Sequence, residues 1–214
     1  MVWDLPTRLF HWGFATSIIG AFISGERGLT EAHEYFGLAA LGFFVFRLIW
    51  GFVGHETVRF THFLTPPRVL VAYIGDVVKR RRHEPPLGHN PLGGLAVIAI
   101  LTVMGVMAIT GLWTGDDILY EAPLTVAGIS PELAGPMAAW HERLHFLVPL
   151  LVILHLVALF LHRIWLGEKL VTRMITGGAG MKKPSARQTA LGLVLLMLCV
   201  SGSLSLSFLT PSYG

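Results

Sequence analysis

Four histidines stand in an otherwise apolar stretch, AAWHERLHFLVPLLVILHLVALFLHR at residues 138–163. A neutral imidazole is a common metal ligand, and an ionisable group inside a membrane is by default a functional hypothesis. Two kinds of chemistry fit the spacing. The residues from His141 to His145 spell H-E-x-x-H, the zinc-protease pattern. Alternatively His141 and His155, fourteen residues apart, could each bind one of two haem irons.

The composition is that of a membrane protein. Of 214 residues, 53% are hydrophobic and only 14% are charged, against about 25% charged in soluble domains. We therefore expect an all-α integral membrane protein. The single cysteine, Cys199, excludes a disulfide framework, a cysteine-based metal site and covalent haem attachment. No cleavable signal peptide is expected, because Asp4 precedes the apolar run from Leu9 and no A-x-A site follows it.

Five apolar runs are long enough to cross the membrane, since a core about 30 Å thick needs about 20 residues. They cover residues 6–24, 34–53, 92–113, 140–162 and 189–209. Asp4 or Thr7 is the expected N-cap of the first helix. Five tryptophans near the predicted span ends, Trp12, Trp50, Trp113, Trp140 and Trp165, are expected to anchor the protein at the membrane surfaces.

The orientation follows from the distribution of Lys and Arg, which concentrate in cytoplasmic loops. Loop 54–91 carries Arg59, Arg68, Lys79, Arg80, Arg81 and Arg82, and loop 163–188 carries Arg163, Lys169, Arg173, Lys182, Lys183 and Arg187. Loop 114–139 has neither Lys nor Arg but contains Asp116, Asp117, Glu121 and Glu132. The N-terminus is therefore expected in the cytoplasm and the C-terminus outside. This asymmetry explains the sequence pI of about 9.3, so no nucleic-acid partner is expected.

This topology arranges four histidines in two pairs of equal depth. His33 and His141 fall at the outer ends of their spans, and His11 and His155 toward the cytoplasm. In one unbroken helix, His141 and His155 would be about 21 Å apart along the axis and differ by about 40° in direction. Each pair could clamp one haem iron between neutral imidazoles. His145 and His162 are expected to be ordinary polar residues.

The zinc-protease alternative explains less. Such a site needs a third protein ligand, and spans 140–162 and 189–209 contain no aspartate. It also leaves His11, His33 and His155 without a role. Glu142 is then more simply a carboxylate near a helix N-terminus, where negative charge is favourable.

Several segments together resemble the bacterial cytochrome b561 family, which includes the membrane cytochrome b subunits of nickel–iron hydrogenases. They are VWDLPTRLFHW at 2–12, HEYFGLAALGFFVFRLIWGFVG at 33–54, GHNPLGGLAVIAIL at 88–101, WHERLHFLVPLLVILHLVALFLHR at 140–163 and LVTRMITG at 170–177. The resemblance implies a four-helix transmembrane bundle, residues 1–178, holding two non-covalent b haems. Residues 179–214 would add a cytoplasmic linker and a fifth transmembrane helix.

The resemblance also maps the family's ligands onto this chain: His11 and His155 for the inner haem, and His33 and His141 for the outer haem. Arg8 and Arg47 are expected near the propionates of the inner haem and Arg143 near those of the outer haem, although all three could instead reach lipid headgroups. Gly13 and Gly37 could let a porphyrin approach the backbone or could simply serve helix packing.

The family passes electrons between membrane quinone and a redox partner outside, which predicts a bacterial inner-membrane protein. A soluble c-type cytochrome with a basic face is the hypothesised partner of the acidic loop 114–139, because complementary charge steers association. The simpler alternative is that outer loops are generally depleted of Lys and Arg. Two alternatives remain open. The protein could be a self-contained superoxide or quinone oxidoreductase, or the membrane anchor of a hydrogenase or dehydrogenase.

Overall fold

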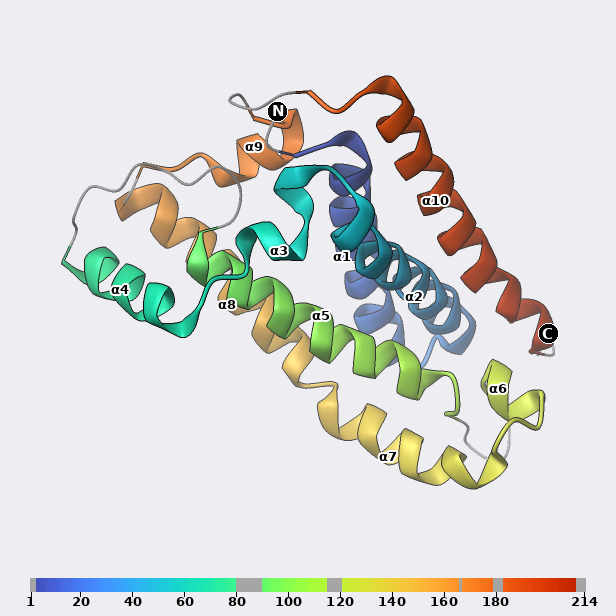
Figure 1. The fold of residues 1–214 in the computed structure, drawn as a ribbon. Helices are drawn as coiled ribbons and strands as arrows, with labels where there is room; N and C mark the ends of the chain where they lie inside the picture. Colours follow the sequence, from blue (N-terminus) through green and yellow to red (C-terminus); the bar gives the residue numbers. More distant parts are fainter. Residues whose placement is uncertain (1–2, 80–89, 115–120, 166, 179–182, 211–214) are drawn as a thin grey trace. The chain divides into compact units, whose positions relative to one another are not determined.

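The computed structural model describes residues 3–79, 90–114, 121–165, 167–178 and 183–210, and within these ranges the regular elements are helices joined by loops and turns (Figure 1). The long helices are α1 (Leu5–Glu26), α2 (Thr30–Val53), α5 (Pro91–Gly111), α7 (Ala134–Leu144), α8 (Leu147–Trp165) and α10 (Ala186–Leu204). Shorter elements connect them: η1 (Glu56–Val58), α3 (Phe60–Phe63), α4 (Pro67–Val78), α6 (Pro123–Val126), η2 (Pro131–Leu133), α9 (Leu170–Thr176) and η3 (Ser205–Leu209). The predicted all-α class is confirmed.

Four segments of the described chain are long and apolar enough to cross a membrane. They are Thr30–Val53, Pro91–Gly111, Pro131–Trp165 and Ala186–Leu209. Helix α1 is not among these four, so the five-span topology stays a prediction. The predicted orientation rests partly on residues 80–82, 116–117 and 182, which lie outside the described residues.

The internal contacts divide the chain into two compact units. The first unit comprises Met1–Leu9, Arg47–Ile100 and Leu151–Leu193, and the second comprises Phe10–Phe46, Leu101–Leu150 and Val194–Gly214. Helices α1, α2, α5, α8 and α10 contribute residues to both units. Each unit is described by itself below, and the predicted domain division at residue 178 stays a prediction.

Asp4 organises the beginning of α1 in the first unit. Its Oδ1 accepts a 2.8 Å hydrogen bond from the Thr7 backbone N–H, which confirms Asp4 as the N-cap. Its Oδ2 accepts a 3.1 Å hydrogen bond from the indole N–H of Trp50. Trp50 is only 1% exposed, and a Cβ on Gly192 would lie 2.8 Å from its ring. The prediction that Trp50 anchors at the membrane surface is therefore wrong, since this indole packs inside the protein.

Asn90 connects α5 to α8 in the first unit. Its Oδ1 accepts a 2.7 Å hydrogen bond from the Gly93 N–H and so caps α5. Its Nδ2 donates to His162 Nε2 over 3.0 Å, while His162 Nδ1 donates to the Ala158 carbonyl over 2.8 Å. Both ring nitrogens of His162 are thus used in the fold, in agreement with its expected role as a satisfied polar residue.

The predicted span 140–162 is not one helix. Helix α7 ends at Leu144 and α8 begins at Leu147. Pro149 explains the break, because it has no N–H for the carbonyl four residues earlier, at His145, and its ring clashes with that carbonyl. The His145 carbonyl instead accepts the N–H of Val148 over 3.1 Å. The axial and angular spacing calculated for an unbroken helix between His141 and His155 therefore does not apply.

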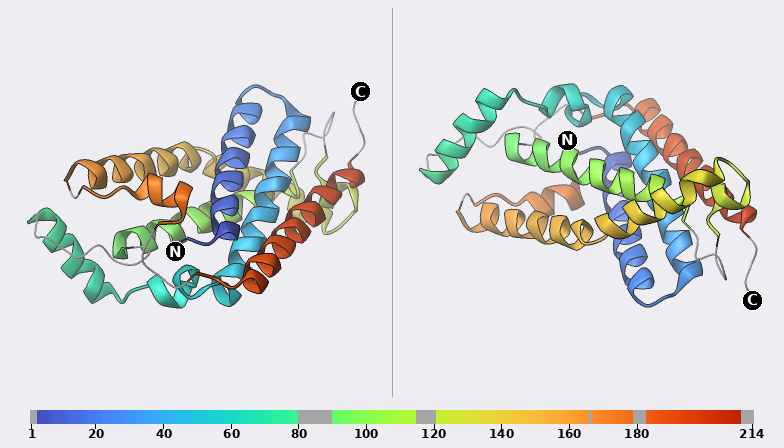
Figure 2. Two further views of the ribbon diagram at one scale, coloured as in Figure 1. Left: turned by 90° about the horizontal axis from the view of Figure 1, so that it is seen from above. Right: turned by 90° about the horizontal axis from the view of Figure 1, so that it is seen from below.

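In the second unit, α1 and α2 lie side by side as an antiparallel pair (Figure 2). Helix α10 packs closely on α2 at Gly42, where a Cβ would lie 2.4 Å from Ser203 Oγ and 2.6 Å from Val200 Cα. Ser203 of α10 therefore packs against α2 at this glycine. Ser201 and Ser205 are exposed and donate to the Met197 and Gly202 carbonyls of α10.

Replacing Asn90 separates its two roles. Asn90→Ser keeps a capping oxygen but is too short to reach His162, so we expect a loss of about 1 kcal/mol in the free energy of unfolding. Asn90→Ala also removes the cap, so we expect it to lower the free energy of unfolding by a further amount of about 0.5–2 kcal/mol. Denaturant unfolding in detergent measures both variants against the parent. Equal stability of Asn90→Ser and the parent would contradict the contribution of the link to His162.

Candidate functional site

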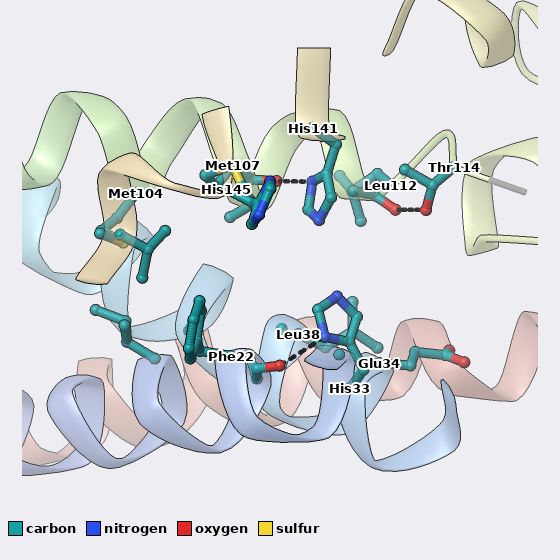
Figure 3. Close-up of a pocket in the computed structure, with 18 of the residues that line it drawn as sticks. Phe22, His33, Glu34, Leu38, Met104, Met107, Leu112, Thr114, His141 and His145 are labelled. Carbon is teal, nitrogen blue, oxygen red and sulfur yellow. Dashed lines mark hydrogen bonds between the residues drawn. The ribbon is translucent and has the colours of Figure 1, made fainter. Parts of the chain in front are cut away.

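A cavity of about 440 Å³ lies within the second unit, among α1, α2, α5 and α7 (Figure 3). Most of its wall is apolar and includes Phe22, Leu38, Met104 and Met107. This volume falls in the range of about 300–1,000 Å³ that is typical of small-molecule and cofactor sites. Three histidines line it: His33, His141 and His145.

His33 and His141 face each other across this cavity. His33 comes from the first turns of α2 and His141 from α7, 108 positions later in the chain. Their ring centroids are 6.0 Å apart and their planes are nearly perpendicular, at 87°. The structure thus brings together the two residues that were predicted as the outer pair.

Each of the two rings is held by a helix carbonyl. His33 Nδ1 lies 2.8 Å from the carbonyl oxygen of Ala21 in α1, and His141 Nδ1 lies 3.0 Å from that of Met107 in α5. A carbonyl oxygen only accepts, so both Nδ1 atoms carry the proton and both Nε2 atoms keep a lone pair. Figure 3 shows the free ring nitrogens pointing toward one another.

This geometry fits one metal ion bound between two imidazoles. With imidazole–metal distances of about 2.0–2.1 Å, and about 1.1 Å from each ring centre to its nitrogen, two imidazoles in line with a metal ion would have ring centres about 6.3 Å apart. The observed separation is 6.0 Å. A hydrogen bond from the second ring nitrogen to a carbonyl is also the usual way in which proteins orient ligating histidines. The residues present therefore fit a bis-imidazole centre such as that of a haem.

The two glycines singled out in the sequence behave differently. A Cβ on Gly37, which lines the cavity, would meet nothing within 4 Å, so Gly37 leaves open space one turn after His33. A Cβ on Gly13 would lie 2.2 Å from the ring of Phe43. Gly13 therefore serves the packing of α1 on α2, and the interpretation that it admits a porphyrin is wrong.

The H-E-x-x-H pattern gains no support from the cavity. His141 faces His33, whereas the Nδ1 of His145 is engaged by the Glu142 carbonyl of the same segment. Within the described ranges, no group of three or more His, Cys, Asp or Glu side chains is arranged to hold a metal ion. The cavity thus presents two facing imidazoles rather than a zinc-protease ligand set.

The predicted inner site is divided between the units. His11 belongs to the second unit and His155 to the first, so their pairing stays a prediction.

The arginines predicted beside the inner haem are held in the first unit. Arg47 is 3% exposed, donates Nη2 to the Val58 carbonyl over 3.1 Å and lies 4.5 Å above the Phe60 ring centre. Arg8 donates Nη1 to the Ile175 carbonyl over 2.6 Å. Within the described part of the chain, one nitrogen of each arginine, Arg47 Nη1 and Arg8 Nε, is buried without a hydrogen-bond partner. Buried polar atoms normally have partners, and carboxylates of a cofactor would provide them.

Arg143, predicted beside the outer haem, is exposed and does not line the cavity, although its neighbour Glu142 does.

Apolar helices of membrane-spanning length and an apolar cavity with two inward-facing imidazoles are the features that a helical membrane cytochrome requires. Comparison with known proteins agrees: a family model described as prokaryotic cytochrome b561 matches residues 2–177. The chain belongs to this family, whose members bind b-type haem and transfer electrons in membranes. No curated protein and no solved structure matches the chain.

Substitutions at Gly37 test whether this cavity holds the cofactor. We expect Gly37→Ala to keep the haem content of the parent, because its methyl group enters open space. Gly37→Leu fills the cavity and is expected to lose the haem of this site. The haem absorbance per chain measures both. Gly75→Leu in α4 is the control, because a Cβ there also meets nothing within 4 Å and Gly75 is not one of the residues that line the cavity. Full haem binding by Gly37→Leu would contradict this location.

Proposed function

We propose that this protein carries electrons across the bacterial inner membrane through two non-covalent b haems, between membrane quinone and a redox partner on the outer side. The observation that carries the proposal is the facing pair of His33 and His141, whose free Nε2 atoms meet across an apolar cavity. Membership of the cytochrome b561 family supports it.

A bound haem supplies reversible one-electron chemistry, and the protein sets its position and potential. At the outer site, His33 and His141 provide the two iron ligands. The carbonyls of Ala21 and Met107 fix their tautomers, and the apolar wall excludes water. At the inner site, His11 and His155 provide the ligands, and Arg8 and Arg47 offer their unpartnered nitrogens to the propionates.

The acidic loop 114–139 supports a c-type cytochrome as the partner. Its described residues Glu121 and Glu132 are exposed, whereas Asp116 and Asp117 lie outside the described residues. A surface that is acidic and free of Lys and Arg attracts a partner with a basic face and speeds its association. This arrangement requires the predicted orientation, with the N-terminus in the cytoplasm and the C-terminus in the periplasm.

The haem count tests the proposal. We expect about two haem b per chain in a pyridine haemochrome assay, and about one after replacing any of His11, His33, His141 or His155 by alanine, because each bis-imidazole site loses a ligand. His145→Ala and His162→Ala are the matched controls and should keep both haems. A purified protein with bound zinc and no Soret band would sink the proposal, as would an unchanged haem content in His33→Ala.

The ionic-strength dependence of electron transfer tests the partner. The rate of transfer to a basic c-type cytochrome should fall about tenfold or more as salt rises from about 0.01 to 0.3 M, since the Debye length shortens over that range. Replacing both Glu121 and Glu132 by glutamine should weaken this dependence, whereas Glu56→Gln, on the predicted cytoplasmic side, should not. An electron-transfer rate that does not change with salt concentration would exclude electrostatic docking at this loop.

A further inference from the structure

Two glycines lie close to the Nδ1 side of the facing histidine rings. A Cβ on Gly25 would lie 2.9 Å from His33 Nδ1, and a Cβ on Gly111 would lie 3.2 Å from His141 Cε1 and 3.4 Å from its Nδ1. Gly25 belongs to α1 and Gly111 ends α5, and both line the cavity. Real Cβ atoms essentially never show contacts below 3.0 Å, so a side chain at residue 25 would force the His33 ring to shift from this position.

The same spacing occurs on both helices. Gly25 follows the acceptor Ala21 by four residues, and Gly111 follows the acceptor Met107 by four residues. In an α-helix, a carbonyl bonds the N–H four residues later and keeps one lone pair for a further donor. Side chains lean toward the helix N-terminus, so the residue four positions later covers that carbonyl. A glycine at that position leaves the carbonyl accessible to an imidazole. The hydroxyls of Ser24 and Thr110 also lie 3.1 Å from these two carbonyl oxygens, but each is closer, at 2.7 and 2.8 Å, to the carbonyl one residue earlier.

We propose that Gly25 and Gly111 are positioning residues, which open the Ala21 and Met107 carbonyls so that His33 and His141 are held with Nε2 aimed at the haem iron. The inference rests on the proposed haem function. The hydrogen bond at Nδ1 makes the opposite nitrogen a stronger donor to the metal. A stronger donor stabilises the oxidised iron, so both glycines keep the midpoint potential of this haem low.

The experiment compares Gly25→Ala and Gly111→Ala with Gly135→Ala in the detergent-purified protein. Gly135 is the matched control, because it lies in α7 and a Cβ there would meet nothing within 4 Å. Spectroelectrochemical titration gives the midpoint potentials, and low-temperature EPR gives the largest g value, which depends on the angle between the ligand planes. Circular dichroism and elution volume report folding.

We expect Gly25→Ala to raise the midpoint potential of one haem and to shift its EPR signal, because the added methyl group displaces His33 from the Ala21 carbonyl. Gly111→Ala should change both in the same direction but by less, since its contact is longer. Gly135→Ala should match the parent. Loss of one haem from a folded Gly25→Ala protein also supports the proposal.

Parent-like potentials and EPR signals in both variants would overturn the positioning role. If Gly25→Ala does not fold, Gly111→Ala decides by the same criteria. This variant should fold, because the His141 ring needs to move by only a few tenths of an ångström to accommodate the methyl group. A parent protein without haem would instead refute the proposed function, so the two failures are distinguishable.

Discussion

The outer site depends on one interaction that occurs twice, an imidazole N–H donated to the carbonyl of a neighbouring helix. His33 makes it to Ala21 of α1 and His141 to Met107 of α5. In hydrocarbon, every polar group needs a partner within the protein. The two carbonyls therefore satisfy one nitrogen of each ring and direct the other into the cavity. Without them, neither the tautomers nor the facing geometry of the rings would be fixed.

The helices around this site combine close packing with a retained cavity. Gly13 lets α1 meet Phe43 of α2, and Gly42 lets α2 meet Ser203 of α10. Small residues commonly bring membrane helices together in this way. Gly37 has the opposite effect, because no neighbouring atom fills the space beside it. The distribution of glycines thus determines where the helices touch and where a planar cofactor has room.

Much of this arrangement is predictable from the sequence, for physical reasons. Hydropathy predicts the helices because, in a membrane, an apolar segment must pair its own backbone N–H and C=O groups, and a helix does this. Asp4 is predictable as an N-cap because its side chain can reach an unpaired backbone N–H of the first turn. The pairing of His33 with His141 follows from counting spans. The prediction of a surface anchor fails for Trp50, because a position near a predicted span end does not reveal that Asp4 accepts the indole N–H inside the protein. The helix break at His145 could have been predicted from Pro149.

The carbonyls that hold the imidazoles could not be predicted, because a backbone acceptor leaves no signal in the side-chain sequence. The roles of Gly25 and Gly111 depend on the register between neighbouring helices, which a hydropathy pattern does not determine. A glycine four residues after an acceptor carbonyl is a recognisable spacing only when the imidazole on the facing helix is known.

Low-temperature EPR of the oxidised protein tests the central claim most directly, because it reports both the ligands and the angle between their planes. Two imidazoles at 87° predict a low-spin ferric haem with a single, strongly anisotropic feature at a large g value. A high-spin signal would show that one histidine is not a ligand. A rhombic low-spin signal alone, typical of parallel ligand planes, would contradict the arrangement of His33 and His141.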